Sequence, residues 1–83
     1  MNLEQSIHEF LLSSPDLGIR VNSLAYDQSL IGSGLIDSLA VLDIVEFMES
    51  RFEIRFDPED LTGDNFDTIA AMAALARARM QPA

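Results

Sequence analysis

Cysteine and lysine are both absent from this chain of 83 residues. Without cysteine, neither a disulfide nor a thiolate metal site can form, so any thiol chemistry has to come from an attached group. No apolar run approaches the roughly 18 residues of a membrane span. The first residues, Met1-Asn2-Leu3-Glu4-Gln5, lack the basic region of a secretory signal. We therefore expect a cytoplasmic protein with no membrane insertion.

Positive charge is scarce, since 14 acidic residues face five arginines and the net charge is -9. Phosphate contacts dominate nucleic-acid affinity, and an acidic chain repels phosphate, so the composition argues against DNA or RNA binding. The same repulsion disfavours docking on an anionic membrane surface. An acidic field would speed encounters with basic protein surfaces, although acidity can also serve solubility alone.

A chain of this length predicts one domain over residues 1–83, which we expect to be a monomer. Apolar residues at one helical face predict a first helix: Leu3, Ile7, Phe10 and Leu11. Asn2 is a plausible N-cap, and the segment Ser13-Ser14-Pro15-Asp16 is expected to end the helix.

A long connection follows, over about residues 15–37. Its apolar residues show no sustained helical period: Leu17, Ile19, Val21, Leu24, Leu30, Ile31, Leu35 and Ile36. The alternation of Ile19 and Val21 could indicate a strand, but no partner strand is visible in the sequence. Irregular segments of this length are often functional, and we expect several of these apolar side chains to anchor the loop onto the helices.

The second helix is predicted over residues 38–52, with Asp37 or Ser38 as its cap. A wide apolar stripe should face the core, and it consists of Val41, Ile44, Val45, Met48 and Phe52. Leu39 and Leu42 lie off that stripe, beside acidic residues, and the core does not require them.

Two further helices complete an all-α, four-helix plan with three longer helices and one short third helix. The segment Asp57-Pro58-Glu59-Asp60-Leu61 predicts the start of the short helix, with Asp57 as cap and Pro58 at the first helical position. Thr62-Gly63 is expected to stop it. The last helix should begin after Asp67, with an inner face of Ile69, Met72, Ala73 and Ala76.

Ser38 is the candidate for chemistry, because it stands where the long loop meets the second helix, in the run Gly34-Leu35-Ile36-Asp37-Ser38-Leu39. A helix N-terminus offers unpaired amide donors and the positive end of the dipole, which favour a phosphate. Taken alone, an Asp-Ser-Leu triplet is more often just a helix cap.

The segment from Gly34 to Phe52 resembles the modification-site region of the acyl and peptidyl carrier protein family. The triplet Asp37-Ser38-Leu39 matches the attachment motif of that family. Phe52-Glu53-Ile54 is similar to the end of the family's second helix, and Asn65-Phe66-Asp67-Thr68-Ile69 to the start of its last helix. The resemblance runs from the first helix to about Leu75.

The resemblance implies that Ser38 receives phosphopantetheine from coenzyme A through a phosphopantetheinyl transferase. Asp37 would help to engage that enzyme and its metal. The thiol of the arm would carry cargo as a thioester, loaded by an acyl- or aminoacyl-loading ligase and passed to a downstream synthase or transferase. The domain itself would then be no enzyme, because the cofactor supplies the reactive group.

A partner-binding face is predicted on the outward side of the second helix. Leu39 and Leu42 would give it a desolvated centre, and the acidic residues Asp43, Glu46 and Glu49 would steer a partner with a basic rim. The alternative is a solvated helix face with two incidentally exposed leucines.

The chain departs from housekeeping fatty-acid carriers at Leu35-Ile36, where those carriers usually have a small pair. The pattern is closer to dedicated free-standing carriers of secondary metabolism, amino acids or D-alanine. Bulky Phe47, Met48 and Phe52 would restrict the room for a long chain between helices, so we expect a small acyl or aminoacyl cargo.

Two other functions stay open at this stage: an unmodified acidic adaptor that uses the same face, and a serine hydrolase based on Ser38. His8, the one histidine, has no motif around it that suits a catalytic base. The acidic residues of the region 57–67 lack the spacing of a calcium-binding loop, so no metal site is predicted.

Overall fold

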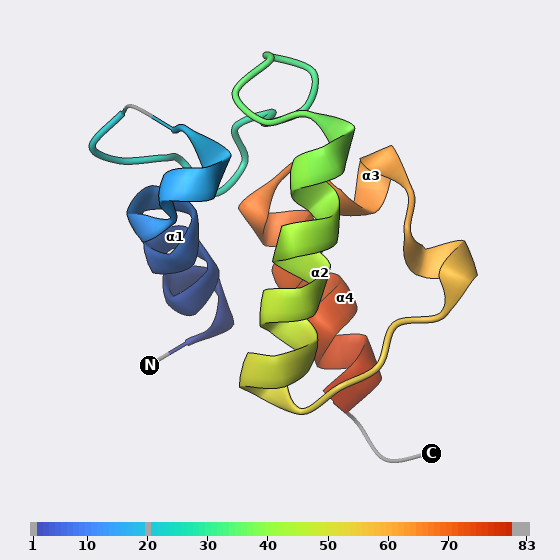
Figure 1. Ribbon diagram of the computed structural model, residues 1–83. Coiled ribbons are helices and arrows are strands. Elements are labelled where there is room, and N and C mark those ends of the chain that lie inside the picture. The colour runs from blue at the N-terminus through green and yellow to red at the C-terminus, as the bar shows by residue number, and fades with distance from the viewer. Residues whose placement is uncertain (1, 20, 81–83) are drawn as a thin grey trace.

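A computed structural model describes residues 2–19 and 21–80, apart from the side chain of Asp16, and within these residues the chain is helical without strands (Figure 1). The α-helices are α1 (Leu3–Ser13), α2 (Ser38–Phe52), α3 (Gly63–Phe66) and α4 (Ile69–Met80). Two short 3₁₀ turns accompany them, η1 (Pro15–Leu17) and η2 (Pro58–Asp60). In Figure 1, α4 lies behind α2, while α1 and α3 stand to either side. The all-α, four-helix prediction is confirmed, and the strand rejected at Ile19 and Val21 is absent from the described chain.

The first helix begins and ends where the sequence predicts. The Asn2 side chain caps it, since its Oδ1 accepts the Gln5 N–H at 2.6 Å. Ile7 and Leu11 are fully buried on its inner face. The helix ends at Ser13, and the Ser14 N–H donates to the carbonyl of Phe10.

The second helix also matches its predicted bounds, and the structure decides which residue caps it. The Ala40 N–H donates to Asp37 Oδ1 at 2.9 Å, so Asp37 is the cap and Ser38 is the first helical residue. Ile44 and Met48 are fully buried. At the other end, Glu53 adopts a left-handed conformation with φ 56°, which turns the chain away from the helix.

The short third helix was predicted at the wrong place. Residues 58–60 form only the 3₁₀ turn η2, and α3 begins at Gly63, which was expected to stop a helix. Two side-chain contacts explain this difference. The Asp60 carboxylate accepts the Asp57 N–H at 2.8 Å, which completes the short turn η2. Thr62 Oγ1 accepts the Asn65 N–H, which caps the start of α3. Asp60 also pairs with Arg79 of α4 through two hydrogen bonds of 2.8 and 2.6 Å.

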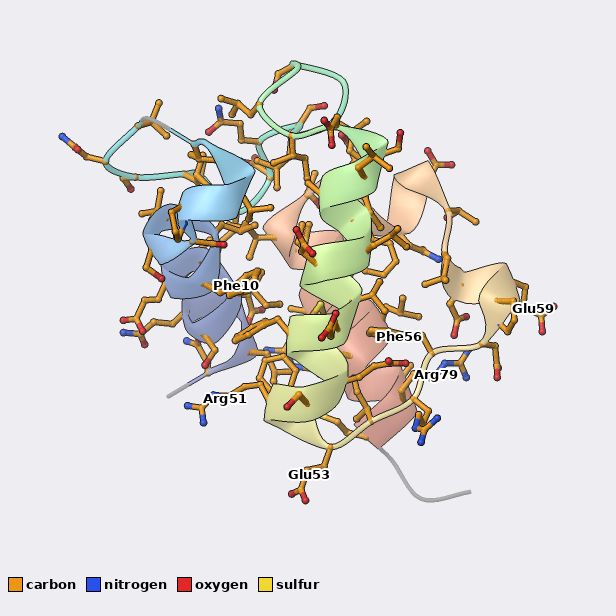
Figure 2. All side chains as sticks on the ribbon, in the orientation of Figure 1. Phe10, Arg51, Glu53, Phe56, Glu59 and Arg79 are labelled. Atoms are coloured by element: carbon orange, nitrogen blue, oxygen red, sulfur yellow. The ribbon has the colours of Figure 1, made fainter. Side chains whose placement is uncertain are left out.

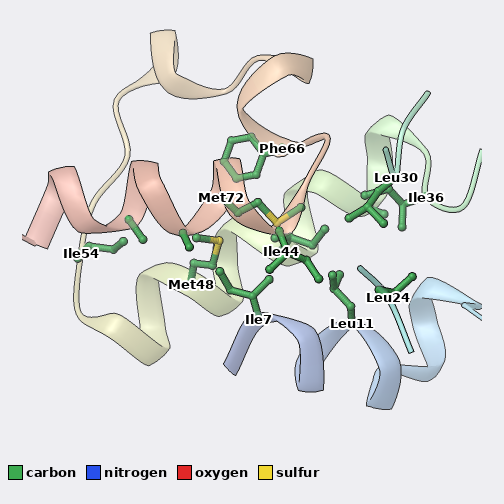
Figure 3. Packing of buried hydrophobic residues seen from close by; sticks show 14 residues of the cluster. Ile7, Leu11, Leu24, Leu30, Ile36, Ile44, Met48, Ile54, Phe66 and Met72 are labelled. Carbon is green, nitrogen blue, oxygen red and sulfur yellow. The ribbon is translucent and has the colours of Figure 1, made fainter. Parts of the chain in front are cut away.

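The core draws on every helix and on the long loop (Figure 3). Its largest fully buried side chains are Ile7, Leu11, Leu30, Ile44, Met48, Phe66, Ile69 and Met72. The loop contributes Leu24, Leu30 and Ile36, each at most 4% exposed. The expectation that apolar loop residues anchor the loop onto the helices is therefore confirmed for these three.

His8 has a structural role in holding the loop. Its Nε2 accepts the Leu24 N–H at 3.0 Å, and its ring meets Tyr26 edge-on with centroids 6.2 Å apart. The acceptor nitrogen of this histidine is therefore already used by the backbone of the loop.

Candidate functional site

The segment before α2 is tied to the start of α4 by one carboxylate. Asp67 accepts hydrogen bonds from the Ser29 hydroxyl at 2.8 Å, the Ile31 N–H at 2.8 Å and the Gly32 N–H at 3.0 Å. Its own carbonyl accepts the Leu30 N–H at 2.6 Å. The pKa of Asp67 is held below its ordinary value, first by the bond from Gly32 and then by that from Ser29. We call this set of contacts the Asp67 brace.

The braced loop then turns into α2. The Gly34 N–H donates to the Ile31 carbonyl at 3.0 Å, and Gly34 has φ +83°, a conformation that side-chain-bearing residues rarely adopt. The Ile36 N–H donates to the Leu30 carbonyl at 3.1 Å, and the Ile36 side chain is buried. These contacts fix the backbone that delivers Asp37 and Ser38 to the first turn of the helix.

Ser38 is exposed at this position, and its hydroxyl is not used as a cap, because Asp37 fills that role. Among the described residues, the hydroxyl has no hydrogen-bond partner. The backbone amides of Ser38 and Leu39 likewise find no protein acceptor in the part of the chain that the structure describes. An exposed hydroxyl beside two such amides, at the positive end of a helix, fits a phosphodiester well.

A hollow of about 350 Å³ opens beside Ser38, between η1, the loop and the first turns of α2. Its lining includes Leu17, Leu35, Ile36, Ala40 and Asp43. The sequence pattern did not indicate this hollow, because Leu17 lies some twenty residues from the others and only the fold brings them together. The space could take the beginning of a flexible arm attached at Ser38.

The predicted partner face is largely open to solvent. Leu39 is 74% and Leu42 is 60% exposed, and Asp43 and Glu46 are exposed beside them. The helical spacing of these four residues places them on one side of α2. Large exposed leucines on a charged helix face suit a protein interface.

Glu49 differs from the other acidic residues of this face. Its side chain is half-buried, and Oε2 accepts the Phe56 N–H at 3.0 Å. This contact holds the segment that follows the left-handed turn at Glu53 against α2. Glu49 therefore has a role within the chain, which the sequence did not indicate.

The serine hydrolase considered from the sequence gains no geometric support. The His8 nitrogen is engaged by Leu24, as described above, and no contact joins His8 to Ser38 among the described residues. The Asp60 carboxylate is bound by Arg79, and the Asp67 carboxylate is bound by the loop before α2. In the described ranges, three or more side chains that could share a metal ion are not found together. Within those ranges, too, every helix is too short or too polar to traverse a bilayer.

Comparison with known proteins bears directly on this site. Residues 14–76 match the family model described as the phosphopantetheine attachment site. Curated proteins and solved structures gave no match. The matched range contains the Asp67 brace, the hollow and all of α2. Domains of this kind are carriers without catalytic activity of their own, and they hold the phosphopantetheine covalently. The chain belongs to the phosphopantetheine-attachment family, as a carrier domain of the acyl and peptidyl carrier type.

Proposed function

We propose that Ser38 is the attachment residue and that the protein holds an acyl or aminoacyl cargo as a thioester on the attached arm. The observation that carries this proposal is the exposed Ser38 hydroxyl in the first turn of α2, left without a capping role because Asp37 has taken it. The bond between Ser38 Oγ and the phosphorus next to the pantetheine would form as the pyrophosphate P–O bond of coenzyme A breaks; adenosine 3′,5′-bisphosphate leaves, and the hydroxyl proton passes to a base of the transferase.

The residues around Ser38 have distinct tasks in this proposal. The amides of Ser38 and Leu39 would donate to the phosphodiester, whose negative charge the helix dipole favours. Asp37 keeps the first turn in place through Ala40 and presents its carboxylate beside the serine, where the transferase and its metal would bind. When attached, the cofactor supplies the thiol that the cysteine-free chain lacks.

The exposed side of α2 would serve as the docking face for successive partners: the transferase, a loading ligase and a downstream synthase or transferase. Leu39 and Leu42 would enter an apolar pocket of the partner, and Asp43 and Glu46 would meet its basic rim. With only two leucines at its centre, the interface is small, and small interfaces release quickly, as a shuttle requires.

We further propose that the cargo is a small acyl or aminoacyl group. Met48 is fully buried, Phe47 stacks on Phe10, and Phe52 packs on the same core. These side chains occupy the core side of α2, so a long chain would find little room in the interior of the domain. Loading assays with a series of acyl and aminoacyl groups test the point, and a strong preference for long acyl chains would contradict it.

The attachment itself is tested by intact mass after incubation with coenzyme A, magnesium and a permissive transferase. The wild type and Ser50→Ala, a matched change at an exposed serine of the same helix, should each gain one phosphopantetheine. Ser38→Ala should gain none. A wild type that stays unmodified with several transferases would favour the adaptor, which uses the same exposed leucines without an arm.

A further inference from the structure

A second hollow, of about 470 Å³, lies between α1 and α2. Its floor is aromatic: the rings of Phe10 and Phe47 stack with centroids 4.1 Å apart and an interplanar angle of 11°. Polar residues of α2 form one wall, namely Asp43, Glu46, Ser50 and Arg51. Figure 2 shows Phe10 and Arg51 on the side of α2 that faces α1. We call this hollow the α1–α2 groove.

The groove and the hollow beside Ser38 have one residue in common. Asp43 lines both spaces, so both border the same part of α2. The α2 residues of the groove follow at intervals of three and four, which makes them one face of the helix. A flexible group attached at Ser38 can therefore pass through the first hollow and enter the groove at Asp43.

The length of the arm matches this path. Phosphopantetheine places its sulfur about 14 bonds from the serine oxygen, or roughly 16 Å at the spacing of an extended chain. Along the helix axis, Asp43 lies about 7 Å and Phe47 about 14 Å from Ser38. Because the arm must also pass around the end of the helix, its reach would bring the sulfur near Asp43 and Glu46. The cargo beyond it then meets Phe47 and Phe10.

The charged side chains change from acidic to basic along the groove. Asp43 and Glu46, both exposed, lie at the end near Ser38, and Arg51 lies at the far end. None of the three belongs to an ion pair among the described residues. An ammonium close to the sulfur would be attracted by the two carboxylates and kept away from the guanidinium. An apolar body beyond the ammonium would rest on the aromatic floor.

We propose that the α1–α2 groove binds the cargo on the arm and selects an aminoacyl thioester with an apolar side chain. In such a thioester, the ammonium is on the carbon next to the carbonyl, which places it beside Asp43 and Glu46. The side chain then covers the Phe10–Phe47 stack and loses contact with water. This proposal rests on the attachment at Ser38 and adds the class of cargo and its place of rest.

The test uses the full chain carrying an arm that ends in an amine instead of a thiol, so that the cargo is held by a stable amide. Two cargoes are compared: a leucyl group and the 4-methylpentanoyl group, which has the same shape without the ammonium. Nuclear Overhauser contacts from the cargo methyl groups to the rings of Phe10 and Phe47 report docking, and amide shifts of α2 report the docked fraction. The intact mass first shows that the arm is on Ser38.

We expect the leucyl cargo to contact both rings and to be docked at least about five-fold more often than 4-methylpentanoyl, the factor for one ion pair at 4 Å in water. Asp43→Asn with Glu46→Gln should reduce leucyl docking by a similar factor, whereas Glu59→Gln on η2 should not change it. Equal docking of the two cargoes, or no contact with Phe10 and Phe47, overturns the proposal while the attachment stands. If the intact mass of the wild-type chain shows no arm, both the attachment at Ser38 and the proposal on the cargo are overturned.

Discussion

Leu30 allows the role of the long loop in stability to be measured. This residue lies outside every helix, yet its side chain is fully buried, and its backbone joins Asp67 on one side and Ile36 on the other. Truncation of a fully buried leucine to alanine costs about 2–5 kcal/mol, since it loses transfer free energy and leaves a cavity. A domain of this size has a total stability of roughly 4–12 kcal/mol. Leu30→Ala should therefore remove a large share of the free energy of unfolding.

Leu42→Ala is the matched control, because it makes the same chemical change at a residue that is 60% exposed within α2. Surface substitutions of this kind usually stay within about 0.5 kcal/mol. Urea unfolding followed by helical circular dichroism measures both variants. A loss of 2 kcal/mol in Leu30→Ala corresponds to a fall of at least about 8 °C in Tm. If the loop leucine costs no more than the helix leucine, the loop is not part of the core and the reasoning fails.

Three further predictions concern other contacts. Hydrogen bonds hold the pKa of Asp67 below its ordinary value, so their contribution to stability is fully present above that ordinary value and is lost as the pH falls through the lowered pKa. Asp67→Asn should flatten the acid side of a stability–pH curve, and an unchanged curve would contradict the role of the Asp67 brace. Arg79→Gln should lower Tm more than Arg77→Gln, because Arg79 binds the buried Asp60 through two bonds whereas Arg77 has one bond to Glu4; equal shifts in a thermal melt would count against this. Leu42→Ala should lower kcat/KM for modification by a transferase about five-fold or more without changing the melt, and full activity would remove Leu42 from the partner face.

The sequence predicts well the features that depend on neighbouring residues. The apolar period, together with the cap and stop residues, predicted the bounds of α1 and α2, and the inner face of α4 is buried as expected at Ile69 and Met72. The exposure of Leu39 and Leu42 followed from the same wheel, since both lay off the core stripe. Such features can be predicted from helix geometry and from the preference of apolar side chains for the core.

Features that depend on distant residues could not be predicted in this way. The Asp67 brace joins residues separated by 35 to 38 positions, and no local pattern indicates it. The position of α3 depends on Thr62, which caps it, and on Asp60, which closes η2 by accepting the Asp57 N–H and pairs with the distant Arg79. Glu49 belonged to the acidic face by its spacing, but the left-handed turn at Glu53 brings Phe56 back to it.

The Asp67 brace also determines which parts of the molecule open together. The loop before α2 is bound to Asp67, two residues before α4, so the loop and this segment cannot separate without exposing the amides of Ile31 and Gly32. Cooperative units of this kind exchange their amide hydrogens at a common rate. In deuterated solvent, these two amides should therefore exchange together with the beginning of α4, whose Ala70 N–H also donates to the Tyr26 carbonyl of the loop at 2.9 Å. The base of the arm would then move with the last helix of the chain, although Ser38 belongs to the second.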